Sequence, residues 1–124
     1  MSRILRFILM CSIVMITSGA QIVSAHAMPD HCEPRVGSTV DKPPAEVRIW
    51  FNEKIESAFS GIEVFGADGK QIDKKDSHVD AKENRLLIVS VGTLAPGTYR
   101  VAWHVVSVDT HKTSGDFKFT VKPQ

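Results

Sequence analysis

The sequence has few cysteines, few aromatic residues and almost no excess of either charge. Two cysteines occur among 124 residues, and aromatic residues make up 7% of the chain. The 15 Lys and Arg residues nearly balance the 14 Asp and Glu residues, for a formal charge of +1. This balance argues against electrostatic binding to nucleic acid or to an anionic membrane surface. With 43% hydrophobic residues, the composition is that of one modest globular domain.

The first 25 residues have the three-part layout of a secretory signal peptide. Two early arginines precede the apolar run FILMCSIVMIT at 7–17, and small residues end the segment at Ala25. The run is shorter than the ~20 residues of a membrane span, which favours a cleaved signal over an anchor. We predict cleavage between Ala25 and His26, and a mature domain of residues 26–124 without a membrane span.

Cleavage there removes Cys11 and leaves Cys32 as the single cysteine, so that no intramolecular disulfide can form. The mature domain must therefore be held together by its core or by a bound ligand. Cys32 is either a small buried hydrophobe or an exposed reactive thiol in an oxidising compartment. We expect it to be buried or inert.

Alternating apolar residues predict strands along the mature chain. In VRIWFN (47–52), Val47, Ile49 and Phe51 share one face, as in a strand with one buried side. Similar strands are expected at 61–66, 86–91, 99–106 and 116–122, with turns at 42–44, 71–85, 95–97 and 110–115. No window favours a long helix. The pattern predicts a single all-β domain, an antiparallel β-sandwich or small barrel, with Trp103 at the centre of its core.

His26 differs from the other histidines because cleavage would make it the first residue of the chain. Its free α-amine and its imidazole Nδ1 could then chelate one metal ion. Both groups lose their protons near neutral pH, since their ordinary pKa values are ~7.7–8.0 and ~6.5. Copper(II) prefers nitrogen and oxygen donors in tetragonal geometry and is the best match. His78, in a charged loop, is expected only to be solvated.

Asp109 and His111 offer two further donors. Residues two apart in an extended segment project to the same side, so one carboxylate and one imidazole could reach the same ion. The segment follows the strand at 99–106, where ligands are braced by the sheet and open to solvent. Together with His26, the pair would make a set of three nitrogens and one oxygen.

These pieces resemble the CopC-type periplasmic copper-binding proteins over most of the mature chain. The most specific matches are LAPGTYRVAWHVVSVDTH (94–111) and GDFKFTV (115–121). Weaker ones are the initial HA (26–27), EPRVGS (33–38) and VRIWFNEKIESAFSG (47–61). The resemblance implies a Greek-key β-sandwich in the periplasm and a surface copper(II) site formed by His26, Asp109 and His111. It also implies that Glu53 lies beside the site, where it would hydrogen-bond a ligand; the alternative is a solvated carboxylate.

The chain differs in its methionines from some members of the family that it resembles. Some members bind copper(I) through a methionine-rich loop, whereas residues 61–85 contain no methionine and Met28 is the only one after residue 25. We therefore predict no separate copper(I) site. His31, with Cys32 and Met28, could form a second metal site, but His31 is expected to be merely exposed.

The sequence leaves three functions open. The first is a monomeric copper(II) carrier or buffer for copper homeostasis or resistance, which would pass copper to the CopD-type inner-membrane transporter that the resemblance implies. The second is a copper oxygenase, because polysaccharide monooxygenases also bind copper through a terminal histidine. Against this enzyme stand the small size of the domain and a carboxylate at the position that oxygen would need. The third is a metal-free interaction module.

Overall fold

The computed structural model describes residues 26–124, so the predicted signal peptide lies outside the described residues. This part of the chain forms eight strands and one short 3-10 helix, η1 (Ser57–Phe59). The strands are β1 (Pro29–Glu33), β2 (Thr39–Val40), β3 (Glu46–Phe51), β4 (Gly61–Phe65), β5 (His78–Val79), β6 (Leu86–Ser90), β7 (Gly97–Val106) and β8 (Lys112–Val121). In residues 26–124, no helix has the length and apolarity that crossing a membrane requires.

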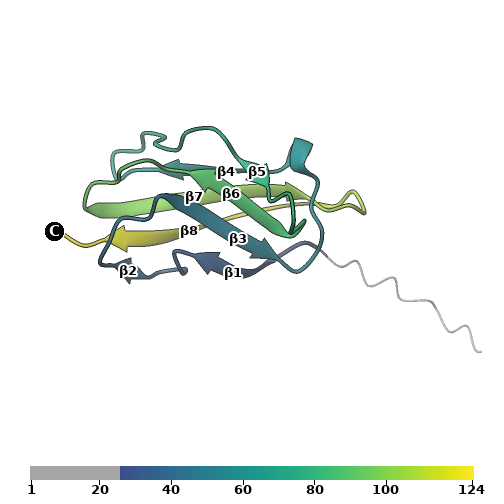
Figure 1. The fold of residues 1–124 in the computed structure, drawn as a ribbon, viewed down its shortest axis with the longest axis horizontal. Helices are drawn as coiled ribbons and strands as arrows, with labels where there is room; N and C mark the ends of the chain where they lie inside the picture. Colours follow the sequence, from purple (N-terminus) through teal and green to yellow (C-terminus); the bar gives the residue numbers. More distant parts are fainter. Residues whose placement is uncertain (1–25) are drawn as a thin grey trace, which may run out of the picture.

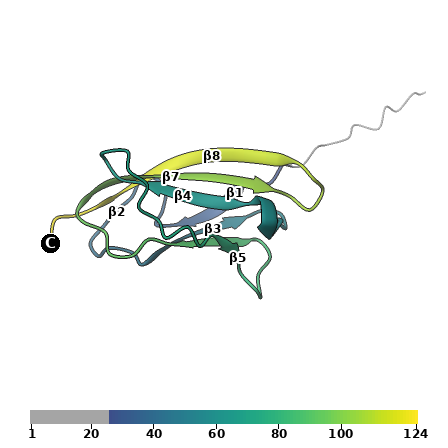
Figure 2. The same ribbon diagram turned by 90° about the horizontal axis from the view of Figure 1, so that it is seen from above.

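The strands form two four-stranded sheets that pack face to face (Figure 1). One sheet has the order β1-β3-β6-β5 and the other β2-β8-β7-β4. Figure 2 shows the two layers from above, with β8, β7 and β4 in one and β3 and β5 in the other. Neighbouring strands are antiparallel, except that β2 runs parallel to the end of β8. The predicted all-β sandwich is confirmed.

Trp103 lies in the core between the sheets, as the sequence predicts. It is 6% exposed, and its ring meets Phe51 of the opposite sheet edge to face, with 5.3 Å between ring centroids. Gly115, its partner on β8, leaves room for the ring, because a Cβ at Gly115 would lie 2.6 Å from Trp103 Cζ2. The two long strands are therefore packed around one buried indole.

One expected turn is wrong in its position. The sequence analysis places a turn at 110–115, but β8 already begins at Lys112 and pairs there with Val106 of β7. The connection is therefore a tight turn that contains the two predicted ligands Asp109 and His111. The polar residues that open β8 have no strand pattern of their own and are held in place by pairing with β7.

Candidate metal centre

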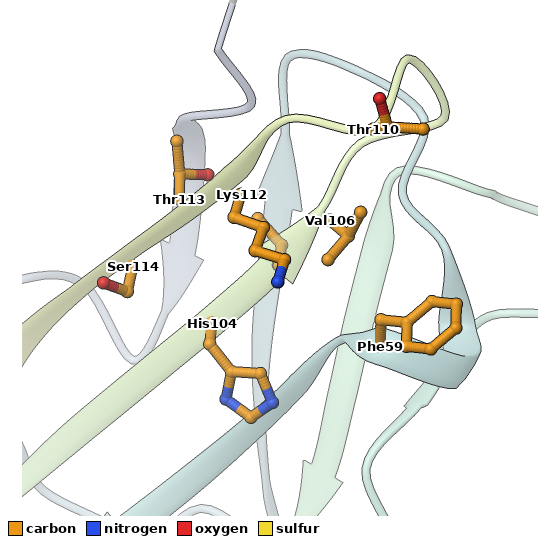
Figure 3. Close-up of a pocket in the computed structure, with 8 residues that line it drawn as sticks. Phe59, His104, Val106, Thr110, Lys112, Thr113 and Ser114 are labelled. Atoms are coloured by element: carbon orange, nitrogen blue, oxygen red, sulfur yellow. The ribbon is translucent and has the colours of Figure 1, made fainter.

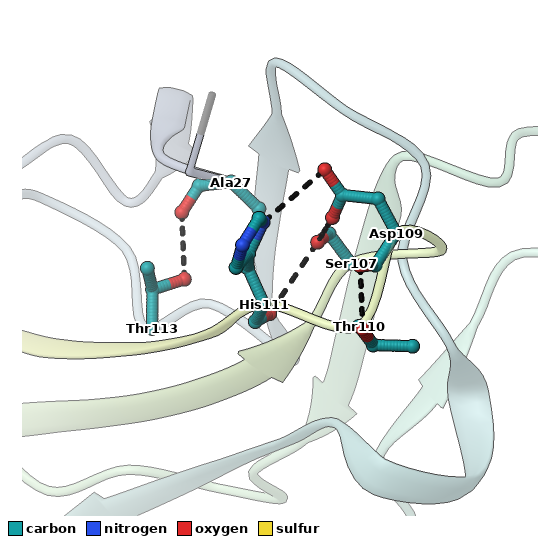
Figure 4. Close-up of polar contacts among 6 residues, drawn as sticks. All are labelled: Ala27, Ser107, Asp109, Thr110, His111 and Thr113. Carbon is teal, nitrogen blue, oxygen red and sulfur yellow. Dashed lines mark hydrogen bonds and ion pairs between the residues drawn. The ribbon is translucent and has the colours of Figure 1, made fainter. Parts of the chain in front are cut away.

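The two predicted half-sites meet at one end of the sandwich. The His26 and His111 rings lie 5.3 Å apart, centroid to centroid, and cross at 70°. His111 Nδ1 lies 3.3 Å from Asp109 Oδ2, and both side chains are about half exposed. The structure thus brings all three predicted ligands to the turn between β7 and β8, where solvent can reach them. Figure 4 shows the Asp109 and His111 part of this cluster.

Backbone hydrogen bonds define the turn. Ser107 N–H donates to the His111 carbonyl over 3.0 Å, and Thr110 N–H donates to the Ser107 carbonyl over 2.8 Å. Thr110 has a φ of 73°, a left-handed conformation that a β-branched residue rarely adopts. The turn is therefore tight and strained at the residue between the two ligands.

Asp109 is charged in this setting. The Ser107 hydroxyl donates a short hydrogen bond to Asp109 Oδ1, while Oδ2 faces His111. The hydrogen bond from Ser107 and, more weakly, the interactions with His111 hold the pKa of the Asp109 carboxyl below its ordinary value, against the opposing effect of desolvation. The side chain is thus an anion near neutral pH and can bind a cation without first losing a proton.

Hydrogen bonds at the next two residues, Ala27 and Met28, hold the segment that carries His26. Thr113 Oγ1 of β8 donates a 2.7 Å hydrogen bond to the carbonyl of Ala27, which is fully buried (Figure 4). At the next residue, Met28 N–H donates to Asn52 Oδ1 and the Met28 carbonyl accepts from Asn52 N–H. These contacts hold Ala27 and Met28 between β8 and the end of β3.

The complete four-donor set is not assembled in the full-length chain. Within residues 26–124, no three His, Cys, Asp or Glu side chains are grouped closely enough to hold one metal ion. The backbone nitrogen of His26 is in a peptide bond with Ala25 in this sequence, and only cleavage would turn it into an amine. The structure therefore places two imidazoles and a carboxylate at the same turn, but not close enough to one another to share one ion, and the fourth donor would come only from cleavage.

Glu53 is half-buried and directly follows Asn52. Among the described residues, its carboxylate forms no hydrogen bond or ion pair with Asp109 or His111. A role of Glu53 beside the site therefore stays a prediction.

The other candidate metal-binding residues do not converge. His31 packs on Trp50 with 5.0 Å between ring centroids, and its Nε2 lies 3.2 Å from Glu33 Oε1. Cys32, next along β1, points into the core and is 5% exposed, and burial raises the pKa of its thiol to about 11. The expectation that Cys32 is buried is confirmed, and its sulfur points away from His31.

His78 and His104 also lie apart from the cluster. His78 is exposed, and its Nδ1 lies 2.9 Å from the Asp76 carbonyl. His104 is exposed on β7, above Gly61. Neither histidine is among the groups that face the predicted ligands.

A groove of about 650 Å³ adjoins the turn on the outer face of the β7–β8 sheet (Figure 3). Phe59 of η1 and Lys112 of β8 stand on its sides, and Thr110 forms its end nearest the ligands. None of the three predicted ligands lines it, so the metal centre lies beside the groove and not inside it.

Ser107 and Thr113 contact the candidate site but were not predicted from the sequence. Isolated hydroxyl residues in or beside strands carry no motif, and their partners Asp109 and Ala27 are defined only by the folded turn. The spacing of Ser107 and Asp109, two residues apart, is the one sequence signal that could have pointed to the first contact.

Comparison with known proteins identifies the family. Residues 30–122 match the CopC domain. Protein YobA of Escherichia coli K12 is 39% identical over 101 residues, covering 81% of this chain and 82% of YobA. Copper resistance protein C of Xanthomonas campestris pv. juglandis is 33% identical, covering 90% and 93% of the two chains. Copper transport protein CutJ of Bacillus subtilis is 31% identical over 78% of this chain, which matches 18% of CutJ.

Solved structures agree with the sequence comparisons. CopC from Methylosinus trichosporium OB3b superposes with a TM-score of 0.71 at 29% identity, covering 80% of this chain and 96% of that one. PcoC, a methionine-rich copper resistance protein from Escherichia coli, superposes with a TM-score of 0.68 at 30% identity, covering 79% and 100%. The chain therefore belongs to the CopC family, which includes proteins named for copper resistance.

Proposed function

We propose that the mature chain, residues 26–124, is a periplasmic copper(II) carrier or buffer in copper homeostasis or resistance. The observation that carries the proposal is the meeting of His26, from the start of the domain, with the Asp109 and His111 pair of the β7–β8 turn. Relatives named for copper resistance and copper transport support copper as the cargo.

The donor set suits copper(II). Cleavage before His26 would supply an amine and an imidazole from one residue, and His111 and Asp109 would add a nitrogen and an oxygen. Three nitrogens and one oxygen match the tetragonal preference of copper(II). The His26 and His111 rings are already in contact. Binding of copper(II) therefore requires cleavage to release the amine and a rotation of the rings, but no rearrangement of the sheets.

Residues 26–124 lack the donors for a separate copper(I) site. Copper(I) prefers soft thioether and thiolate ligands. Met28 is the one methionine after residue 25, and the Cys32 sulfur is buried in the core. The contrast with PcoC, described as methionine-rich, supports a protein that handles copper(II) alone.

The partner in this proposal is a CopD-type inner-membrane copper transporter, and the carrier acts as a monomer. The match to CutJ supports the coupling to transport, because a segment similar to this chain forms 18% of that longer copper transport protein. A half-exposed site at one end of the sandwich allows a partner's donors to reach the ion and replace the ligands one at a time.

The copper oxygenase considered from the sequence receives no support from the family, whose members are copper resistance proteins. Asp109, anchored by Ser107, would also occupy the coordination position that oxygen needs.

Titration of the purified mature chain with copper(II) tests the proposal. One ion per chain is expected, with an electron paramagnetic resonance (EPR) spectrum of three nitrogen donors and one oxygen donor. The His111→Ala variant should lose one nitrogen from the spectrum, whereas His78→Ala, a matched change far from the turn, should leave it unaltered. A spectrum that is the same in His111→Ala and in the unmodified chain would contradict the site.

A further inference from the structure

Ser107 is a fully buried polar residue with its hydroxyl directed at a predicted ligand. It is 0% exposed, and its Oγ donates to Asp109 Oδ1. Its backbone is bridged to Ile55 on one side and bonded to the His111 carbonyl on the other. The backbone of Ser107 is therefore fixed at the base of the turn, and its hydroxyl also lies 3.4 Å from the His111 carbonyl, a second acceptor.

This bond favours one carboxylate oxygen, Oδ2, as the metal ligand, because Oδ1 already accepts the Ser107 hydroxyl. Oδ1 is occupied by the Ser107 hydroxyl, whereas Oδ2 faces His111 at 3.3 Å. An ion bound next to His111 would meet a carboxylate that is already oriented and offers a single oxygen. Such pre-oriented ligands bind metals more tightly than ligands that must first be ordered.

Thr113 does the same for the other half of the site. Its Oγ1 donates a 2.7 Å hydrogen bond to the carbonyl of Ala27, the residue next to His26. Because Ala27 is fully buried, this bond fixes the position from which His26 extends toward His111.

We propose that Ser107 and Thr113 are positioning residues of the copper site: Ser107 orients Asp109 as a one-oxygen ligand, and Thr113 holds the terminal histidine beside His111. The proposal rests on the proposed function. Ser107 and Thr113 flank the short segment that contains Asp109 and His111 (Figure 4). The same turn therefore positions its own two ligands and the segment that carries His26.

Ser107→Ala tests the first half in the mature protein. Loss of a side chain that orients a metal ligand lowers metal affinity by about 10- to 100-fold. We expect this weakening for copper(II), together with an altered copper hyperfine coupling in the EPR spectrum. Ser60→Ala is the matched control, because Ser60 is also buried and its Oγ accepts a hydrogen bond from Val106 N–H without touching a ligand.

Thr113→Val tests the second half and does not depend on the folding of the first variant. Valine keeps the shape of the side chain and removes the bond to Ala27. We expect a loss of copper(II) affinity of about 10-fold or more. Thr98→Val is the control, because Thr98 pairs with Thr120 through their hydroxyls near the far end of the same hairpin.

Combined variants show which ligand each hydroxyl serves. Ser107→Ala should weaken binding no further once Asp109 is replaced by alanine, and Thr113→Val should weaken it no further once an extra alanine precedes His26. If the extra alanine leaves the affinity unchanged, the copper site itself is wrong. If it weakens binding while Ser107→Ala and Thr113→Val bind like their controls, only the positioning roles are overturned.

Discussion

The imidazole rings of His26 and His111 are in edge-to-face contact, with 5.3 Å between their centroids. One ring comes from the first described residue and the other from the turn between the last two strands. The contact links the predicted cleavage site to the predicted ligand pair.

The pH dependence of copper binding should follow the nitrogen donors and not Asp109. The hydrogen bond from Ser107 lowers the Asp109 pKa, so its carboxylate stays charged when the protein is acidified through the ordinary imidazole pKa of about 6.5. Copper should be released as pH falls toward and below ~6. Competition titrations from pH 5 to 8 check this.

The Asp109 carboxylate should stabilise the fold near neutral pH and lose this effect in strong acid. Its lowered folded-state pKa means that the charged form is favoured by folding, so this contribution is present above the unfolded value of 3.8 and is lost as pH falls through the folded value. The metal-free Asp109→Asn variant should therefore be less stable than the unmodified chain above pH ~4, and the difference should disappear as the pH falls further; denaturant unfolding at a series of pH values measures it.

The Cys32 thiol should be inert in the folded protein. Burial raises its pKa to about 11 from an ordinary 9.0, so the reactive thiolate is disfavoured and the sulfur is shielded. A thiol reagent at pH 8 should label the denatured chain rapidly and the native chain hardly at all. The raised pKa also predicts that stability is unaffected by this group below pH ~9 and decreases between pH ~9 and ~11. Rapid labelling of the native protein would contradict the burial.

The strained turn should be improved by a residue that tolerates a positive φ. Thr110 has a φ of 73°, and asparagine adopts this conformation more readily than a β-branched residue. Thr110→Asn should raise the free energy of unfolding of the metal-free protein by about 1 kcal/mol. Denaturant unfolding in the presence of a chelator measures the free energy of unfolding of both proteins. A lower value for Thr110→Asn than for the unmodified chain would contradict strain at Thr110.

The long strands and the sandwich were predictable because their apolar residues alternate. The strand at 46–51 and the core around Trp103 follow from this alternation. The short strand β1 was not predictable from the sequence, because PDHCE includes proline and charged residues and only Cys32 is buried. Its strand geometry comes from pairing with β3, which no local pattern encodes.

The site was predictable only in its ligands. His26, Asp109 and His111 are recognisable from the predicted cleavage point and from their spacing, and the structure brings them to one turn. Ser107 and Thr113 were missed because their importance depends on what lies opposite them in the folded hairpin.

Gly115 should be needed for the packing of Trp103. A Cβ there would lie 2.6 Å from the buried indole, so Gly115→Ala should destabilise the fold by about 1–3 kcal/mol. Gly61→Ala is the control, because its Cβ would meet the exposed His104 ring, which can move aside. Its cost should be about 0.5 kcal/mol or less. Thermal unfolding followed by tryptophan fluorescence compares the two, and equal losses would contradict the packing around Trp103.

The most direct test of the copper site is a single added residue. Mature protein beginning at His26 should bind copper(II) with an amine and two imidazoles, whereas the same protein with one alanine before His26 moves the amine out of reach. Competition titration should show affinity weaker by orders of magnitude in the extended protein, and the EPR spectrum should change its nitrogen donors. Equal affinities and identical spectra would contradict the account.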